Sequence, residues 1–325
     1  MSDQPRVFVT RQIAEEAIEK LRQHCDVDLW TDEMPPSREV LLQRVASIEG
    51  LLCLLTERVD GELLDHAPRL KVISNLAVGY DNIDVPAATE RGIPVGNTPD
   101  VLTETTADLA FALLMAAARR LPEAERYVHA GQWRTWSPTL LLGHDVYGAT
   151  LGIIGFGRIG QAVARRAKGF EMRVLYHGGS DKNTAQQLGV EEHSLDDLLA
   201  ESDFVSIHTP LTEQTYHLIS RRELSLMKPT AVLVNTARGG VVDPVALYHA
   251  LKDRAIAAAT LDVTEPEPIP QDDPLLSLDN CLIVPHIGSG TVSTRRKMAM
   301  MATENLLAGL RDERLPYCVN PQVYD

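Results

Sequence analysis

The stretch LGIIGFGRIG, residues 151–160, constrains the fold more than any other part of the sequence. It places Gly155, Gly157 and Gly160 directly after the apolar run TLGII and before the helical segment QAVARRAKG. In this setting the first glycine allows a tight turn, the second lets the backbone approach a pyrophosphate, and the third allows close helix–strand packing. The free N–H groups at the helix start face the anion. We therefore predict a strand–turn–helix unit that binds a dinucleotide.

Short apolar segments alternate with helical segments on both sides of this motif. Those before it are RVFVT (6–10), EGLLCLL (49–55), KVISNLA (71–77) and IPVGN (93–97), and those after it are MRVLYH (172–177), DFVSIHT (203–209), AVLVNTA (231–237), AAATLDV (257–263) and CLIVPHI (281–287). Continuous apolar strands separated by helices are typical of parallel sheets buried on both faces. The pattern occurs twice in 325 residues, so the sequence predicts two α/β domains.

The C-terminal segment indicates how these domains are connected. After HIGSGT the sequence continues as RRKMAMMATENLLAGLRDERLP, an amphipathic helical segment with no strand of its own. Such a helix packs most easily back onto the first half of the chain. We therefore expect residues 1–100 and 289–325 to form one domain, and residues 101–288 to form an inserted dinucleotide-binding domain. Residues 129–150 have little periodicity and several turn-forming residues, and we expect an ordered connection there.

Composition and charge exclude several classes of partner. The net charge of −14 argues against a nucleic-acid partner. The four cysteines are scattered without metal-like spacing, which favours reduced thiols and no metal site. The N-terminal MSDQPRVFVT has neither a cationic leader nor an apolar signal core, and the longest apolar helical run, residues 109–118, is about half of a bilayer span. We therefore expect a cytoplasmic protein without a membrane partner.

Three further segments each follow a predicted strand, at the end where open α/β sheets bind ligands. VNTARGGVVD carries Arg238, LDVTEPEP carries Glu265 and Glu267, and VPHIGSGT carries His286. Each residue alone has a common structural or surface role. Together they are the set required to reduce an α-keto acid: an arginine fork for a carboxylate and carbonyl, a histidine that exchanges a proton near neutrality, and a carboxylate that orients it and favours its protonated form.

The strand after the glycine motif ends in LYHGGSDKN, where an NAD site usually has an acidic residue for the ribose hydroxyls. His177 occupies that position, and no carboxylate precedes Asp181. The lack of an acid removes repulsion against a 2′-phosphate, to which Ser180 or Lys182 could donate, although no arginine is present. NADP(H) is therefore favoured as the cofactor, and NAD(H) remains the alternative.

These motifs resemble the signatures of the D-isomer-specific 2-hydroxyacid dehydrogenase family. LGIIGFGRIG, VNTARGG, LDVTEPEP and PHIGSGT occur in the family's order, after NLAVGYDNIDV (75–85) and TTADLAFALLM (105–115). The resemblance runs from about residue 50 to the end, and it implies a discontinuous substrate domain around an inserted Rossmann domain. Within the family, AVGYDNID, DVTEPEP and WRTW are most similar to the glyoxylate/hydroxypyruvate reductases.

The resemblance also implies roles for residues at matching motif positions. Arg238 would bind the substrate carboxylate and carbonyl, His286 would be the general acid/base, and Glu267 would pair with His286. The backbone N–H groups of Val78 and Gly79 would hold the substrate carboxylate. Glu265 is then a surface neighbour and receives no role.

For the cofactor, the resemblance implies Asp262 as the carboxylate near the nicotinamide amide, with Thr106 and Ser289 as lesser contacts. Trp136 resembles a tryptophan that reaches the partner subunit's active site; anchoring a dimer interface without substrate contact is the equal alternative. The remaining cofactor contacts are expected in the glycine loop and at strand ends, at Gly155, Phe156, Gly157, Arg158, Ile159, Gly160, His177, Ser180, Lys182, Thr209, Pro210, Thr236, Ala237 and His286.

The resemblance implies a homodimeric reductase that uses NAD(P)H to convert glyoxylate to glycolate or hydroxypyruvate to D-glycerate. One alternative is a D-2-hydroxyacid dehydrogenase of another substrate range, acting on D-3-phosphoglycerate, phosphite or bulkier 2-keto acids. The lysine that phosphite dehydrogenases carry in the loop at 75–79 is absent here. A dinucleotide-sensing protein like the corepressors of the C-terminal-binding-protein type is the alternative from another functional class.

Overall fold

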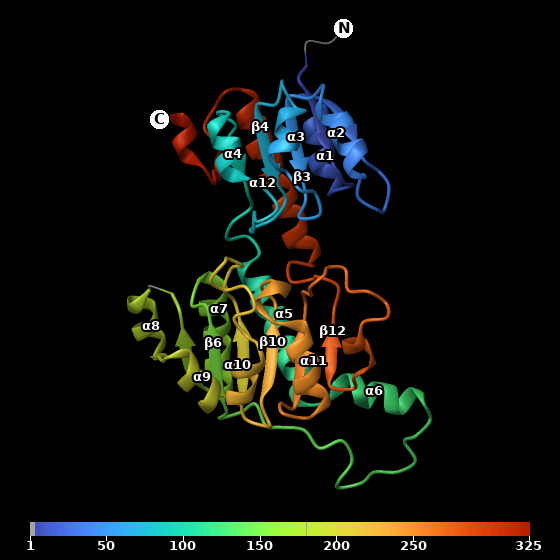
Figure 1. The fold of residues 1–325 in the computed structure, drawn as a ribbon, viewed down its shortest axis with the longest axis vertical. Helices are drawn as coiled ribbons and strands as arrows, with labels where there is room; N and C mark the ends of the chain where they lie inside the picture. Colours follow the sequence, from blue (N-terminus) through green and yellow to red (C-terminus); the bar gives the residue numbers. More distant parts are fainter. Residues whose placement is uncertain (1–3, 180) are drawn as a thin grey trace. The chain divides into compact units, whose positions relative to one another are not determined.

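The computed structural model describes residues 4–179 and 181–325, which fold into two compact units (Figure 1). Unit 1 comprises the described residues up to Leu102 together with Thr291–Asp325. Unit 2, Thr103–Gly290, is inserted between these two parts. The boundaries lie two residues beyond the positions expected from the sequence.

Unit 1 contains a parallel sheet of five strands in the described residues, with the order β2-β1-β3-β4-β5. Its central strands β3 and β4 are completely buried, as continuous apolar runs require. The elements are β1 (Arg6–Val9), α1 (Glu15–Arg22), β2 (Asp26–Leu29), α2 (Arg38–Val45), β3 (Gly50–Cys53), α3 (Gly61–Asp65), β4 (Val72–Asn75), α4 (Val85–Glu90), β5 (Val95–Gly96), α12 (Val292–Leu310) and η4 (Pro321–Tyr324).

The C-terminal helix α12 belongs to the core of unit 1. It packs against β3, β4 and α1. A Cβ atom on Gly309 would lie 2.5 Å from the Val72 side chain, so the helix approaches β4 as closely as a glycine permits. Ser74 Oγ donates a hydrogen bond to the Ala302 carbonyl at 2.8 Å, and Asn305 Nδ2 donates to the Asn97 carbonyl at 2.9 Å. The helix is therefore tied to the sheet by polar contacts as well as by apolar ones.

Unit 2 contains a parallel sheet of seven strands in the described residues, with the order β12-β11-β10-β9-β6-β7-β8. This order reverses direction between β6 and β9, as in Rossmann folds, where ligands bind at the reversal. The elements are α5 (Thr103–Ala118), α6 (Leu121–His129), β6 (Thr150–Ile154), α7 (Arg158–Ala167), η1 (Lys168–Phe170), β7 (Arg173–His177), α8 (Lys182–Leu188), β8 (Glu191–Glu192), α9 (Leu195–Glu201), β9 (Phe204–Ile207), α10 (Arg221–Leu226), β10 (Val232–Asn235), η2 (Gly239–Val241), α11 (Pro244–Lys252), β11 (Ala258–Leu261), η3 (Pro274–Ser277) and β12 (Cys281–Ile283).

Alternate residues of the central strands face two separate apolar clusters. Val232 and Val234 of β10 belong to the cluster that includes α5 and α7, whereas Leu233 belongs to the one that includes α9, α10 and α11. Successive side chains of a strand point to opposite faces, so each face receives its own core. The predicted fold class, two α/β domains built on parallel sheets, is confirmed.

Two strands were not expected from the sequence. β2 and β8 each lie at one edge of their sheet, and they carry acidic residues in place of an apolar run. A strand at an edge needs no continuous apolar sequence because one side of it faces solvent. No helix among the described residues is long and apolar enough to span a membrane.

Candidate functional site

The strands β10, β11 and β12 end at the same level of the unit 2 sheet. Asn235, the last residue of β10, is in register with Leu261 of β11, and Leu261 is in register with Ile283 of β12. Neighbouring strands lie about 4.8 Å apart. The loops that follow these strands carry Arg238, Glu267 and His286. The topology therefore places all three loops at one edge of the sheet.

His286 and Glu267 contact one another directly. The distance between His286 Nδ1 and Glu267 Oε1 is 2.5 Å, and their side chains are 30% and 41% exposed. When Nδ1–H donates to the carboxylate, Nε2 is the ring nitrogen left for another partner. The backbone of His286 adopts a φ of 52°, in the left-handed region that non-glycine residues rarely occupy. Glu267 thus fixes the orientation of the His286 ring through Nδ1 and leaves Nε2 to a ligand.

Asp262 anchors the loop that carries His286. Its carboxylate accepts hydrogen bonds from the N–H groups of Ile287 at 2.6 Å and Gly288 at 2.8 Å, and its carbonyl accepts one from the N–H of His286 at 2.9 Å. Burial raises the pKa of Asp262, while these amide donors act in the opposite direction. Asp262 therefore holds the residue at position 286 in its unusual backbone conformation.

The loop that carries Arg238 packs tightly on the loop that follows β11. A Cβ atom on Gly239 would lie 1.9 Å from the carbonyl oxygen of Thr264, so only glycine fits there. The Asn235 side chain accepts a hydrogen bond from the Ala237 N–H at 3.0 Å and donates one to the Arg238 carbonyl at 2.9 Å. The guanidinium of Arg238 donates to the Ala237 carbonyl at 2.8 Å. The backbone around Arg238 is thus fixed from both sides.

The glycine loop between β6 and α7 has the geometry that its spacing predicts. Gly155 has a φ of 94°, and a Cβ atom there would lie 2.6 Å from the Thr209 nitrogen. A Cβ atom on Gly160 would lie 2.3 Å from the Gly155 carbonyl oxygen. Gly157 is the N-cap of α7, has no side chain to cap the helix, and borders open space. The start of α7 is therefore not capped by a side chain, as the start of an anion-binding helix requires.

The other residues expected at the cofactor are distributed as follows. Thr236 is buried, and its hydroxyl has no hydrogen-bond partner among the described residues. His177 ends β7, and its Nδ1 lies 3.1 Å from the His193 carbonyl. Lys182 is exposed and its ammonium lies 3.3 Å from Glu192. Ser180 lies outside the described residues.

Thr209 and Pro210 follow β9 and lie beside the glycine loop, with Thr209 close to Gly155. His208 immediately precedes them. Burial lowers the pKa of His208 to about 4. Its Nε2 contacts Ser206 Oγ at 2.8 Å, whereas its Nδ1 has no partner in the part of the chain that the structure describes. His208 therefore sits beneath the glycine loop as a neutral ring.

Thr106 and Ser289, expected as lesser cofactor contacts, are both buried. Thr106 lies in the first turn of α5. A Cβ atom on Gly288 would lie 2.9 Å from Asp262 Oδ2 and 3.4 Å from the Thr106 side chain. Thr106, Asp262 and the loop after His286 therefore form one packed group in unit 2.

Val78 and Gly79 lie in unit 1, in the loop after β4. The Val78 carbonyl accepts a hydrogen bond from Asn97 Nδ2 at 2.8 Å, and the Gly79 carbonyl accepts one from Asn75 Nδ2 at 2.9 Å. Among the residues that the structure describes, the N–H groups of Val78 and Gly79 have no hydrogen-bond partner. Two asparagines therefore fix this loop by its carbonyls and leave two adjacent donors available.

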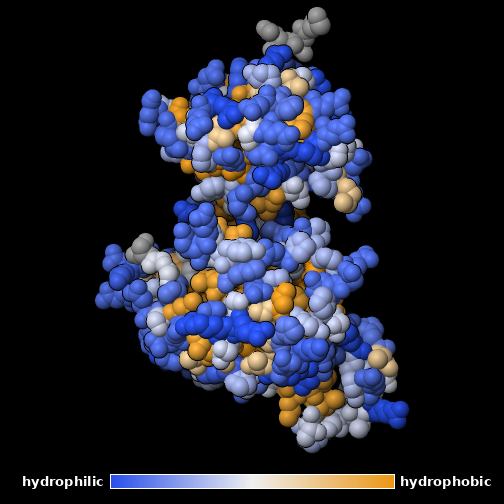
Figure 2. Space-filling model, viewed as in Figure 1, coloured by the Kyte–Doolittle hydropathy of each residue, from blue (hydrophilic) through white to orange (hydrophobic). Residues whose placement is uncertain are grey.

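Trp136 lies in an irregular segment between α6 and β6. Its side chain is 79% exposed, and that of Trp133 is 62% exposed. Helix α6 has no buried residue. Figure 2 shows apolar surface over the lower part of unit 2, where this segment lies. The segment thus presents large apolar side chains to solvent in the isolated chain.

Glu265 makes a contact that the sequence did not predict. The sequence interpretation treated it as a surface neighbour and gave it no role; in the structure its Oε2 lies 2.8 Å from His217 Nε2, and its side chain is 33% exposed. No feature of the sequence pointed to His217, because it lies 48 positions away in the loop after β9. Pairing of two side chains so distant in the chain follows from the strand order and not from a local motif.

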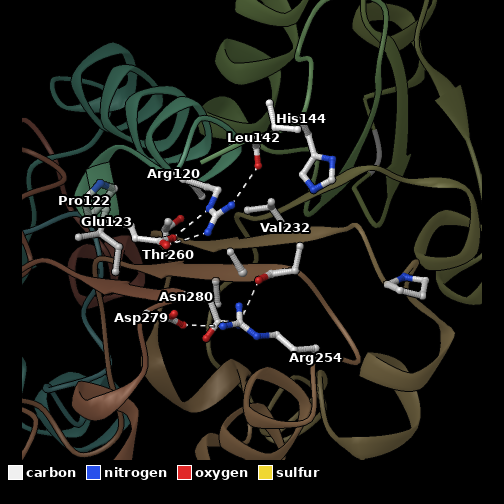
Figure 3. Close-up of a pocket in the computed structure, with 16 residues that line it drawn as sticks. Arg120, Pro122, Glu123, Leu142, His144, Val232, Arg254, Thr260, Asp279 and Asn280 are labelled. Carbon is white, nitrogen blue, oxygen red and sulfur yellow. Dashed lines mark hydrogen bonds and ion pairs between the residues drawn. The ribbon is translucent and has the colours of Figure 1, made fainter. Parts of the chain in front are cut away.

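A cavity of about 330 Å³ lies at the opposite end of the same strands (Figure 3). It is lined by residues at the starts of β10, β11 and β12, and none of the predicted site residues that the structure describes lines it. Its two arginines are bonded to carboxylates: Arg120 to Glu123 at 2.7 Å and Arg254 to Asp279 at 2.7 Å. Within the described residues, no group of three or more potential ligands is placed to hold a metal ion.

Comparisons with known proteins show which family the chain resembles. A family model described as "D-isomer specific 2-hydroxyacid dehydrogenase, NAD binding domain" matches residues 111–288. A protein of Korarchaeum cryptofilum named glyoxylate reductase is 57% identical over 321 residues, which cover 98% of this chain and 97% of that protein. The likeness therefore extends through both units of the chain.

Solved structures give the same result. A protein from Thermus thermophilus is similar with a TM-score of 0.92 and 48% identity, covering 97% of this chain and 99% of that one. A structure described as an NADPH-dependent glyoxylate/hydroxypyruvate reductase from Sinorhizobium meliloti in complex with NADP and malonate has a TM-score of 0.85 and 33% identity, with 98% of each chain covered.

Proposed function

Because the chain belongs to the D-isomer specific 2-hydroxyacid dehydrogenase family, we propose that it reduces glyoxylate or hydroxypyruvate to the corresponding 2-hydroxy acid with a nicotinamide dinucleotide. The observation that carries this proposal is the 2.5 Å contact between His286 and Glu267, in a loop next to the one that carries Arg238. A proton donor with its orienting carboxylate beside a carboxylate-binding arginine is the arrangement that keto acid reduction requires.

In this proposal His286 is the general acid. As the carbonyl carbon is reduced, negative charge develops on the carbonyl oxygen, and His286 Nε2–H donates a proton to it. Glu267 holds Nδ1–H, so the proton to be transferred resides on Nε2, and the carboxylate stabilises the imidazolium before transfer. Asp262 fixes the loop so that the ring keeps this orientation.

Arg238 and the loop after β4 are proposed to bind the substrate. The guanidinium offers two parallel N–H donors to a carboxylate or to a carboxylate and the adjacent carbonyl. The N–H groups of Val78 and Gly79 in unit 1, which have no partner among the described residues, are suited to a carboxylate. Holding the keto acid in one orientation makes the chemical step effectively intramolecular.

The residues of unit 2 fit a dinucleotide. The uncapped start of α7 suits a pyrophosphate, and the buried Thr236 hydroxyl, which has no partner among the described residues, suits a ligand at the end of β10. Phe156, Arg158, Ile159, Thr209, Pro210 and Ala237 border the same loops. When bound, the reduced nicotinamide supplies a hydride to the carbonyl carbon. Unit 2 is therefore proposed as the cofactor domain and unit 1 as the substrate domain.

We propose NADP(H) as the preferred cofactor. His177 stands at the end of β7 where a ribose-binding carboxylate would repel a 2′-phosphate. Lys182 is 75% exposed, so its ion pair with Glu192 is weak and can be exchanged for a phosphate. The Sinorhizobium meliloti structure described as NADPH-dependent supports this preference.

We propose that the protein is a homodimer joined through the segment around α6. The exposed apolar side chains of Leu121, Val128, Trp133, Trp136 and Leu142 all lie within residues 121–142, and such a concentration of exposed apolar side chains is typical of an interaction surface. Analytical ultracentrifugation of a Trp133→Ser/Leu142→Ser variant should give monomers where the wild type gives dimers. A wild type that sediments as a monomer would reject this assembly.

Oxidation of NADPH and NADH with a panel of keto acids tests the function. Glyoxylate and hydroxypyruvate should give the highest kcat/KM, ahead of pyruvate, a bulkier 2-keto acid and 3-phosphohydroxypyruvate, and NADPH should be preferred. Reduction of NAD⁺ or NADP⁺ in the presence of phosphite tests the alternative of a phosphite dehydrogenase. Binding of the dinucleotides without turnover of any substrate would favour a dinucleotide-sensing protein and contradict the proposal.

A further inference from the structure

The segment Thr264–Pro268 carries two glutamates, and each of them contacts a histidine on a different loop. Glu267 contacts His286, as described above. Glu265 Oε2 lies 2.8 Å from His217 Nε2, and the two side chains are 33% and 31% exposed. A half-buried contact of this length between an imidazole and a carboxylate is a charge-assisted hydrogen bond.

The loop that carries His217 is bonded to the residues that follow Arg238. The His217 N–H donates to the Gly240 carbonyl at 2.8 Å, and the Ile219 N–H donates to the Val241 carbonyl at 3.0 Å. His217 has a φ of 50°, and its ring stacks on Tyr216 with a centroid distance of 4.0 Å. Backbone and ring contacts together give the imidazole one orientation.

The Glu265 side of the pair also contacts the loop of Arg238. A Cβ atom on Gly240 would lie 3.3 Å from Glu265 Oε1, and one on Gly239 would lie 1.9 Å from the Thr264 carbonyl oxygen. Arg238 is thus followed by two glycines that pack directly on the segment that carries Glu267. The His217–Glu265 contact joins the loop after β9 to the segment after β11, which already packs on the loop of Arg238.

We propose that His217 and Glu265 are positioning residues for the keto acid, which rests on the proposed function. The pair fixes the loop of Arg238 and the segment of Glu267 to each other, so that the guanidinium and the His286 ring keep one spacing. Misplacement of a binding group by about 1 Å can reduce catalysis by about 10²-fold. The pair acts through Arg238 and Glu267 and does not itself touch the reacting atoms in this proposal.

Three variants test the pair: His217→Ala, Glu265→Ala and the double variant. We expect each to raise KM for glyoxylate about 10-fold, with kcat lowered less and KM for NADPH changed less than about 2-fold. Because both side chains act as one unit, the double variant should be no worse than either single one. The Kd for malonate in the presence of NADP⁺ should rise by the same factor.

Two further variants separate positioning from general stability. Glu265→Gln keeps an oxygen that accepts a hydrogen bond from Nε2–H, and it should restore KM to within about 3-fold of the wild type. His193→Ala removes the 3.4 Å contact between His193 and Glu191, another histidine–carboxylate pair of unit 2, and it should leave KM unchanged. The proposal would be overturned if the effects of the two single variants on KM were strictly additive in the double variant. A fall in the unfolding midpoint without a change in KM would also overturn it.

Amide hydrogen exchange separates this inference from the proposed function. In the protein without substrate, His217→Ala should exchange faster than the wild type in segments 216–219 and 238–242. Faster exchange in a protein that reduces no keto acid would retain the loop contact but reject the function. Unchanged exchange in an active reductase would reject the positioning role while leaving the function intact.

Discussion

The two histidine–glutamate pairs formed by the segment 264–268 have the same chemistry but different surroundings. His286 and His217 both adopt left-handed backbone conformations, with φ of 52° and 50°. His217 stacks on Tyr216, and its N–H is bonded to Gly240. His286 instead belongs to a loop anchored by the buried Asp262, which accepts hydrogen bonds from three backbone N–H groups of that loop.

This difference is why we propose only one of the two histidines as a proton donor. At His286 the anchoring groups hold the backbone and leave the second ring nitrogen to a ligand. Both rings contact a carboxylate through one nitrogen, Nδ1 at His286 and Nε2 at His217, but a face of the His217 ring is covered by Tyr216. The first arrangement suits proton transfer and the second suits loop positioning, and the following substitutions test this distinction.

Replacement of His286 should have the largest effect. His286→Asn removes the proposed proton donor, and kcat for glyoxylate reduction should fall about 10³-fold, whereas the binding of NADPH should change little. The measurement is steady-state kinetics with fluorescence titration of NADPH. If His286→Asn retains wild-type kcat, His286 is not the acid and the contrast between the two histidines is lost.

Arg238→Lys should have the next largest effect. Lysine keeps the charge but lacks the planar pair of donors, so kcat/KM for glyoxylate should fall about 10²-fold, mostly through KM. Arg254→Lys, at the cavity on the opposite end of the strands, is the matched control and should leave kcat/KM unchanged. Equal losses in the two variants would show that the effect is one of stability and not of substrate binding.

The two glutamates should respond differently to the same substitution. Glu267→Gln removes the charge that stabilises the His286 imidazolium, and kcat should fall roughly 30-fold. Glu265→Gln keeps the hydrogen bond that fixes His217, so its kcat should stay near the wild-type value. Parallel kinetics of the two glutamine variants would mean that both carboxylates have the same role.

His208 has no carboxylate partner among the described residues. We expect its protonation to affect the free energy of unfolding. Burial lowers its pKa to about 4 in the folded protein, against about 6.5 in the unfolded chain. Between these values the unfolded chain binds more protons at this site, so stability is lost as the pH falls through this window. The loss should be about 2 kcal/mol between pH 7 and pH 5.

Urea unfolding of the wild type and His208→Gln at several pH values measures this loss. The difference in unfolding free energy between the two proteins should shrink as the pH falls from 7 to 5. His24→Gln, at an exposed site, is the control and should follow the wild type. Parallel pH profiles of wild type and His208→Gln would contradict the assignment of a neutral, buried ring.

Much of the fold was determined by the sequence itself. Continuous apolar runs such as AVLVNTA predicted buried parallel strands, and the glycines at 155, 157 and 160 predicted a strand–turn–helix unit. Both signals are local, because they depend on residues close together in the chain. The edge strands β2 and β8 could not be predicted in this way, since their acidic residues leave no continuous apolar run.

The relations between distant residues were decided by the tertiary structure. Register between β10, β11 and β12 places the loops of Arg238, Glu267 and His286 at one edge of the sheet, and close packing of Gly239 on Thr264 brings Glu265 to His217. Residue types and motif order suggested that Arg238, Glu267 and His286 act together. No periodicity in the sequence indicates the contact between Glu265 and His217. Such contacts arise from strand order and packing, which depend on the whole chain.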